Sequence, residues 1–209
     1  MNHVSEKARK LIKDTYKIAK ANDIEIRLVK DKFVFEDWDK AKLFGSGGYF
    51  DSDNRILAVA IEKRESRWLS IFVHESCHMD QFLSNSRAWE KYSPGHTLFF
   101  NWLQDNKSVK KEQLEQAAQD AIRIELDCER RSLEKIKKYN LDLDEIDYIR
   151  GINAYLHGYL FSLETKKWLP DLYVNKNVLN NCSTRLKKSY TKIPRRLHRA
   201  FVRELKAIS

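Results

Sequence analysis

The stretch that decides the fold is Trp68-Leu69-Ser70-Ile71-Phe72-Val73-His74-Glu75-Ser76-Cys77-His78. It follows Ser66, a residue type favoured as a helix N-cap, and it is apolar on most sides, which predicts a buried helix. His74 and His78 are four residues apart, so both imidazoles lie on one face of that helix and can reach a single metal ion. Glu75 lies beside the first histidine, where it can take a proton from a water that the metal binds.

Chance accounts poorly for this motif. The chain has 6 His and 15 Glu, and a His-Glu-x-x-His pattern is expected about 0.01 times in a chain of this length and composition. The alternative is a pair of histidines that only pack in a core, but two imidazoles and a carboxylate on an apolar helix would need buried polar partners. Zinc suits the motif because it lowers the pKa of a bound water to roughly 7.

A catalytic zinc usually has three protein ligands, so a third must come from elsewhere in the chain. The best candidate segment is Ile124-Glu125-Leu126-Asp127-Cys128-Glu129, within a long helix predicted from Ser108 to about Tyr139. Glu125 and Glu129 share one helix face, where two carboxylates repel each other unless a cation or a proton donor lies between them. We therefore expect Glu125 to be the third metal ligand and Glu129 to orient a metal-binding histidine.

Other interpretations of this acidic segment stay open. The roles of Glu125 and Glu129 can be reversed, and Asp127 is a further candidate ligand. The segment can also be a solvated charged stretch whose acids pair with neighbouring arginines, namely Arg123, Arg130 and Arg131.

His-Glu-x-x-His followed by Glu-x-x-(small residue)-acid resembles the zincin metallopeptidases of the gluzincin type. The order of helix, short strands, histidine helix and acidic helix resembles the small ImmA/IrrE-like and SprT-like zincins, many of which occur in phages. The resemblance covers about residues 5–135. It departs from the family pattern at Cys128, where alanine is usual, and at Glu129, where Asp or Asn is usual. It implies a zinc peptidase with ligands His74, His78 and Glu125, the general base Glu75 and the supporting carboxylate Glu129.

The resemblance also implies a substrate track, because zincins commonly bind peptides antiparallel to an edge strand. Here we expect that strand within Arg55–Ile61, just before the histidine helix. The oxyanion of the reaction needs a further donor, and our candidates are Tyr155 and His157 on a predicted helix, with His96 a weaker one. The alternative for each is a side chain that only packs.

The three cysteines cannot all pair with one another, and a cytosol would keep them reduced. Cys77 lies in the histidine motif, Cys128 lies in the acidic motif, and Cys182 stands apart. We expect Cys77 and Cys128 to be small apolar residues where two helices cross, in preference to thiolate metal ligands or a redox switch.

Most of the net charge of +9 comes from the last part of the chain. Between Arg185 and Lys206 there are nine Lys or Arg residues against one acid, Glu204, a net of eight, which leaves about +1 for the rest. Such a segment can bind nucleic-acid phosphates. The alternatives are a solvated basic face, or one that packs on the acids around Asp142–Asp147, because no nucleic-acid-binding signature accompanies it.

The remaining pattern predicts an α+β protein with a small N-terminal sheet, the buried histidine helix and a mostly helical C-terminal part. We expect a zincin-like domain over residues 1–170 and a basic extension over 171–209, packed on the domain or trailing it. The other predicted elements are a helix over 5–21, strands at 24–29 and 33–35, a hairpin from a turn-rich connector at 45–54 into a strand at 55–61, a chain break at 93–95, a helix capped by Asp142 or Asp144 and running through Leu160, and a helix after Pro194.

The sequence has no apolar run long enough for a membrane span, and its start lacks the apolar stretch of a signal peptide. We therefore expect a cytoplasmic protein, in the host cytoplasm if a phage encodes it. The expected function is a zinc-dependent hydrolase that cleaves a peptide bond by Glu-assisted attack of zinc-bound water; a non-peptide amide substrate is not separable from this. The alternative is a non-enzymatic metal-containing protein that binds nucleic acid or an acidic partner through Arg185–Lys206.

Overall fold

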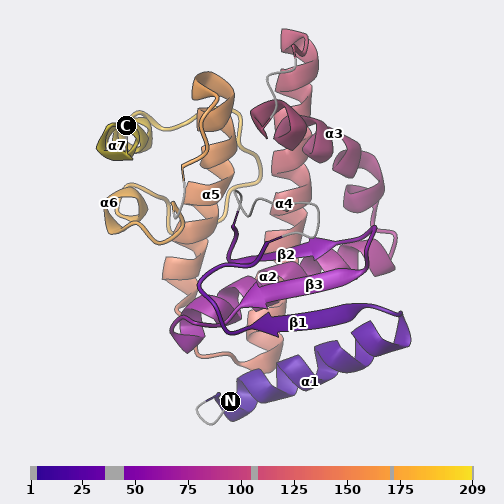
Figure 1. The fold of residues 1–209 in the computed structure, drawn as a ribbon. Coiled ribbons are helices and arrows are strands. Elements are labelled where there is room, and N and C mark those ends of the chain that lie inside the picture. Colours follow the sequence, from indigo (N-terminus) through magenta and orange to yellow (C-terminus); the bar gives the residue numbers. More distant parts are fainter. Residues whose placement is uncertain (1–3, 36–44, 105–107, 170–171, 209) are drawn as a thin grey trace. The chain divides into compact units, whose positions relative to one another are not determined.

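The computed structural model describes residues 4–35, 45–104, 108–169 and 172–208, and it confirms the α+β class (Figure 1). None of the helices in these residues is long and apolar enough to cross a membrane. The elements in chain order are α1 (Glu6–Ala21), β1 (Glu25–Val29), β2 (Gly48–Asp51), β3 (Ile56–Ala60), α2 (Glu65–Leu83), α3 (Arg87–Gln104), α4 (Lys111–Tyr139), α5 (Glu145–Thr165), α6 (Lys176–Leu179) and α7 (Arg195–Ile208).

The chain forms two compact units. The first comprises Met1–Ser86 and Cys128–Leu143, and the second comprises Arg87–Asp127 and Asp144–Ser209. Helix α4 belongs to both, because its N-terminal part lies in the second unit and its C-terminal part in the first. Each unit is therefore described by itself.

The first unit is built on a small sheet of strand order β1-β3-β2. Strand β1 pairs with β3 in parallel, and β2 pairs with β3 antiparallel. Our expectation that Arg55–Ile61 would hold an edge strand is wrong, because β3 is the central strand of this sheet. Its five residues are all apolar and all buried, the pattern of a strand covered on both faces rather than one that borders solvent.

The hairpin predicted before the histidine helix is present between β2 and β3. Asp51 closes its turn, because its Oδ1 accepts hydrogen bonds from the backbone N–H groups of Asp53 and Asn54, each at 2.9 Å. The short strand predicted at 33–35 is reduced to one isolated bridge between Val34 and Ser46.

Helix α2 covers one face of this sheet. A Cβ built on Gly48 would lie 2.6 Å from Cγ2 of Ile71, so this residue of β2 faces the helix at very short range. Phe50, two residues further along the strand and therefore on the same face, contacts the ring of Phe82 with centroids 5.7 Å apart. The histidine helix therefore packs directly under the edge strand β2.

The helix ends show where local sequence signals were sufficient. Of the two predicted caps of α5, Asp142 and Asp144, the structure has Asp144, whose side chain accepts a hydrogen bond from the backbone N–H of Asp147. Ser66, in contrast, lies inside α2, whose N-cap is Arg64 with no side-chain cap. That helix starts earlier than the best capping residue would suggest, because its burial outweighs the cap preference.

The second unit contains α3, which runs without a break through Pro94. The predicted chain break at 93–95 is therefore wrong. A Cβ on Gly95 would lie 2.6 Å from Cβ of Asp120, so the glycine allows α3 and the first half of α4 to approach closely. Close packing of this kind can hold a helix together across a proline, whose local cost is about 3 kcal/mol.

The basic C-terminal segment packs inside this second unit. Leu197, Ala200 and Phe201 of α7 are buried in one cluster with residues of α5 and of the segment around α6, which are Ala154, Phe161, Leu169, Leu172 and Val178. Residues of α7 and of the segment around α6 therefore pack on α5. The proposed limit of a catalytic domain at residue 170 stays a prediction.

Candidate metal centre

The two motif histidines face each other on α2. The Nε2 atoms of His74 and His78 lie 3.2 Å apart, and their ring centroids lie 4.7 Å apart with the rings almost perpendicular. This follows from their four-residue spacing, which places them one helical turn apart on one face. Both side chains are only partly buried, whereas the helix around them is largely buried.

The partners at the other ring nitrogens decide how each histidine is protonated. Nδ1 of His74 lies 3.0 Å from Oε1 of Glu129, and Nδ1 of His78 lies 2.9 Å from Oε1 of Gln81. A carboxylate or an amide oxygen only accepts hydrogen bonds, so each Nδ1 carries the proton and donates it. In the neutral ring, Nε2 is then the nitrogen with the lone pair. Two lone pairs therefore converge between the rings, and they require a proton or a metal ion between them.

The charge around His74 favours a cation at this position. Burial by itself lowers the pKa of His74, but the thiol of Cys128 and the carboxylate of Glu129 beside it outweigh burial and raise that pKa well above the usual range. Negative charge next to a histidine that binds a metal also strengthens the nitrogen as a ligand. The site is thus electrostatically suited to a proton or to a metal cation.

Glu129 reaches His74 because an ion pair and a hydrogen bond hold α2 against the C-terminal part of α4. Nζ of Lys135 lies 2.7 Å from Oδ2 of Asp80 and donates a hydrogen bond of 2.9 Å to Oγ of Ser76. The lysine side chain is mostly buried, so this ion pair is shielded from solvent and holds both helices more firmly than an exposed pair would.

Cys128 joins His74 and His78 in a group whose ligand atoms all lie within 4.8 Å of one another and could hold a metal ion. Its Sγ, however, lies 3.7 Å from Nδ1 of His74 and donates a hydrogen bond to the backbone oxygen of the same residue. The thiol therefore lies at the Nδ1 edge of the ring, which Glu129 also occupies. A metal between the two Nε2 atoms would lie at the opposite edge.

Cys77 lies fully buried in α2. Burial raises the pKa of its thiol to about 12, despite the opposing charge of Lys135. The group therefore stays protonated at neutral pH and fills space, which is the role expected for it.

Glu75 is buried in α2, between the two histidines along the chain. Its Cγ is 3.2 Å from the position that a Cβ on Gly48 would occupy, so strand β2 passes immediately over the carboxylate stem. Because β2 is an edge strand of the sheet, the candidate base lies beneath the strand along which an extended peptide could pair.

In the second unit, the buried Glu125 is the centre of a cluster of polar side chains. Its Oε1 lies 3.3 Å from Nε2 of His96, and it accepts a hydrogen bond of 3.4 Å from the hydroxyl of Tyr159. The hydroxyl of Tyr159 is in turn 3.0 Å from that of Tyr155. Tyr155 and His96 were candidates from the sequence, whereas Tyr159 was not chosen, although its four-residue spacing from Tyr155 places both on one face of α5.

His157 points to a different side of α5 and has structural partners. Its Nδ1 donates a hydrogen bond of 2.6 Å to the backbone oxygen of Asn153, and Nζ of Lys187 lies 3.3 Å from its Nε2. Its ring packs on Tyr190. Burial lowers the pKa of His157 to about 4, so the ring is neutral at pH 7. A part in the reaction stays a prediction for both His157 and Tyr155.

The structure thus brings together His74, His78 and Glu129 in the first unit. Glu129 contacts a ring nitrogen of His74, and such a contact with a histidine was expected of it. The structure also shows a contact between Gln81 and His78 that was not predicted, and it places Cys128 against His74, where the two helices were expected to cross. The signal for Gln81 was its three-residue spacing from His78, which places it on the same helix face.

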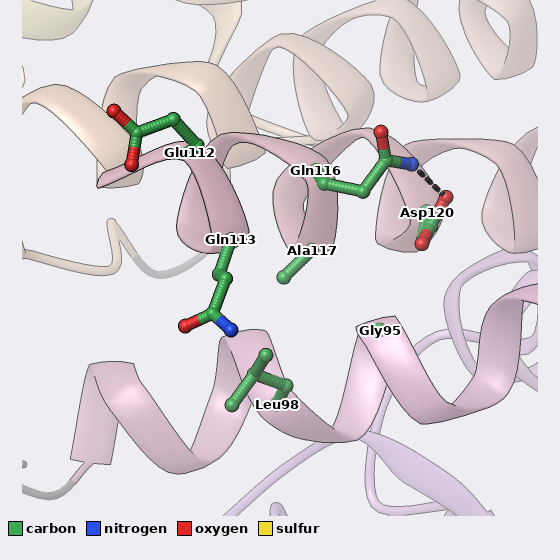
Figure 2. Close-up of a pocket in the computed structure, with 7 residues that line it drawn as sticks. All are labelled: Gly95, Leu98, Glu112, Gln113, Gln116, Ala117 and Asp120. Atoms are coloured by element: carbon green, nitrogen blue, oxygen red, sulfur yellow. Dashed lines mark hydrogen bonds between the residues drawn. The ribbon is translucent and has the colours of Figure 1, made fainter. Parts of the chain in front are cut away.

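A groove elsewhere in the second unit contains none of these residues. It has a volume of about 390 Å³ and lies between α3 and the first half of α4 (Figure 2). Gln116 and Asp120 are hydrogen-bonded along one wall at 2.7 Å. The other lining residues are Gly95, Leu98, Glu112, Gln113 and Ala117.

No family model, curated protein or solved structure matches this chain.

Proposed function

We propose that the protein is a zinc-dependent hydrolase, specifically a metallopeptidase of the gluzincin type, with its metal held by His74 and His78. The observation that carries this proposal is the convergence of the two Nε2 atoms at 3.2 Å, each in a ring whose Nδ1 proton is already donated elsewhere. Two ligands at roughly 2.0–2.1 Å from a tetrahedral ion lie about 3.3 Å apart, so the spacing fits zinc.

The third ligand has two candidates. Glu125 stays our prediction, on its helical spacing from Glu129. Cys128 is the alternative, because its thiol belongs to the group that could hold a metal. Its position at the Nδ1 edge of His74 argues against it, since a metal there would displace Glu129 from that nitrogen.

Each residue of the site would have its own role in the reaction. Glu129 and Gln81 fix the ring orientations of His74 and His78 through the Nδ1 protons, which directs both Nε2 lone pairs at one point. Glu75 accepts a proton from the attacking water and can return it to the leaving amine. Zinc, when bound, supplies a water that is activated at neutral pH and polarises the substrate carbonyl.

A peptide is the substrate class that the surroundings of Glu75 favour. Strand β2 is at the edge of the sheet and passes over Glu75 at Gly48. An extended peptide that adds to this edge gains main-chain hydrogen bonds with little demand on its sequence. The proposed substrate track is therefore β2 and not Arg55–Ile61. We also propose a cytoplasmic protein, where the three free thiols would stay reduced.

The test combines metal analysis with cleavage of a quenched-fluorescent peptide library. The wild-type protein should carry one zinc per chain and cleave the library, and Glu75→Gln should keep the zinc while losing cleavage. A wild type without stoichiometric transition metal contradicts the proposal. A wild type that holds zinc but cleaves nothing supports the alternative, a non-enzymatic metal protein that acts through its basic segment.

A further inference from the structure

Helix α7 carries five basic side chains on one face. Placed at about 100° per residue, they fall within an arc of roughly 100°, and the one acid of the helix, Glu204, falls outside it. All five are exposed. The members of this set, which we call the basic face, are Arg195, Arg196, Arg199, Arg203 and Lys206.

The opposite side of α7 is already occupied. Leu197, Ala200 and Phe201 are buried in the core of the second unit, so the helix has a fixed orientation that directs the basic face outward. The polar pairs seen on α7 involve His198 with Glu164 and Glu204 with Asn177. Neither pair uses a residue of the basic face, so nothing in the described fold accounts for five cations in one arc.

We propose that the basic face binds the phosphate backbone of double-stranded nucleic acid without reading its sequence. From Arg195 to Lys206 the helix rises about 16 Å, and a nucleic-acid strand presents one phosphate per roughly 3.4 Å of duplex axis. Several phosphates therefore lie within reach of the helix, and each of the five cations can neutralise at most one of them. Arginine suits this role, because its planar guanidinium binds phosphate through two parallel hydrogen bonds.

Two other anionic surfaces fit less well. A helix that lies in a membrane surface must insert its apolar face, and the apolar face of α7 is buried in the protein. Single-stranded nucleic acid is usually bound by aromatic side chains that stack on bases, whereas Phe201, the aromatic residue of α7, is fully buried. Charge alone, without base contacts, favours a regular duplex.

The loop before α7 contributes less than its sequence suggests. It carries Arg185, Lys187, Lys188 and Lys192, but Nζ of Lys187 is directed at the buried ring of His157 at 3.3 Å. That lysine is partly buried and contacts a core residue of the unit. The basic face is therefore narrower than the segment Arg185–Lys206, and its charges are positioned by a helix.

The test measures binding of the full chain to a fluorescein-labelled 20-base-pair duplex of arbitrary sequence, by anisotropy, between 50 and 300 mM NaCl. Each neutralised phosphate contributes about −0.9 to the slope of log K against log salt concentration. The wild-type slope should therefore be about −4.5. The triple variant Arg196→Gln, Arg199→Gln and Arg203→Gln should make it shallower by about 3.

A matched control removes the same charge elsewhere. Lys13→Gln, Lys17→Gln and Lys20→Gln act on exposed residues of α1 and also lower the formal charge from +9 by three. This control should keep the wild-type slope. An equal loss of slope in both triple variants would show that bulk charge is responsible and would overturn the proposal, as would the absence of duplex binding at 50 mM NaCl.

Competitors separate the partner classes. Polyglutamate, vesicles containing phosphatidylserine, and a single strand of the same sequence should each compete more weakly than unlabelled duplex. Stronger competition by any one of them overturns the proposal in favour of an acidic protein, a membrane surface or a single strand, respectively. The inference is independent of the proposed hydrolase, so Glu75→Gln should bind the duplex as the wild type does.

Discussion

Helices α2 and α7 both carry polar side chains, but several of those on α2 are buried whereas the basic ones on α7 are exposed. In α2, the buried polar residues Ser76 and Gln81 each meet a specific partner. In α7, the basic face points outward and the buried side is apolar. A buried polar group must be paired inside the protein, so its partners reveal its chemistry. An exposed charge imposes no such condition, so its partner has to be sought outside the chain.

The largest difference between the two helices is expected when one histidine is removed from each. His78→Ala should lower zinc affinity by more than about 100-fold, beyond the 10–100-fold loss typical of residues that only support a ligand. His198→Ala on α7, which removes a half-exposed ion pair with Glu164, should leave zinc affinity unchanged. Isothermal titration with zinc against a competing chelator measures both. Equal losses of zinc affinity in the two variants would contradict the assignment of His78 as a metal ligand.

A second buried histidine extends the comparison to stability. His157 takes up a proton near pH 4 in the folded state and near pH 6.5 when unfolded. Between these values the unfolded state binds more protons, so stability falls as pH falls from about 6.5 to 4. The loss should be on the order of 3 kcal/mol, measured as the excess over His157→Gln in urea unfolding at pH 7 and pH 4. Parallel pH dependence in the two proteins would contradict the buried neutral ring.

A glutamate pair tests the support of the metal ligand. Glu129→Gln removes the negative charge at Nδ1 of His74 and should lower zinc affinity by about 10–100-fold. Glu204→Gln on α7, whose partner is Asn177 at 3.5 Å, should have no effect in the same chelator titration. If zinc affinity survives Glu129→Gln intact, then His74 is oriented by something else.

The smallest expected effect concerns the strand above Glu75. Gly48→Ala places a Cβ 2.6 Å from Ile71 and 3.0 Å from the backbone oxygen of Ala58, so β2 or α2 must shift. Overpacking of this kind costs about 1–3 kcal/mol. Urea unfolding should show that loss, and peptide cleavage should fall while zinc stays bound. An unchanged stability would mean that β2 does not lie as close to α2 as described.

Local signals predicted much of this molecule. The four-residue spacing of His74 and His78 placed both imidazoles on one face, and the same spacing predicted a glutamate at a histidine nitrogen. The cap at Asp144 and the helix after Pro194 were also correct. Each of these depends on neighbours within one or two turns of the chain, where helical geometry is fixed.

What the sequence could not supply depends on tertiary packing. The position of β3 in the middle of the sheet is set by which strands pair with it, although its unbroken apolar run was a usable sign. Pro94 was misinterpreted as a break because close packing at Gly95 is invisible in the sequence. Cys128 was expected at the crossing of two helices, but its particular partner there, the backbone oxygen of His74, depends on how α2 and α4 pack, which no spacing rule gives.

The proposed function requires that the Nε2 atoms of His74 and His78 hold a metal ion. X-ray absorption at the zinc edge of the purified full chain tests it most directly. We predict two imidazole nitrogens at about 2.0–2.1 Å from zinc, with oxygen in the remaining positions and no sulfur. A sulfur neighbour at about 2.3 Å would place Cys128 in the site and remove Glu129 from its role, and a chain that binds no zinc would contradict the proposed function itself.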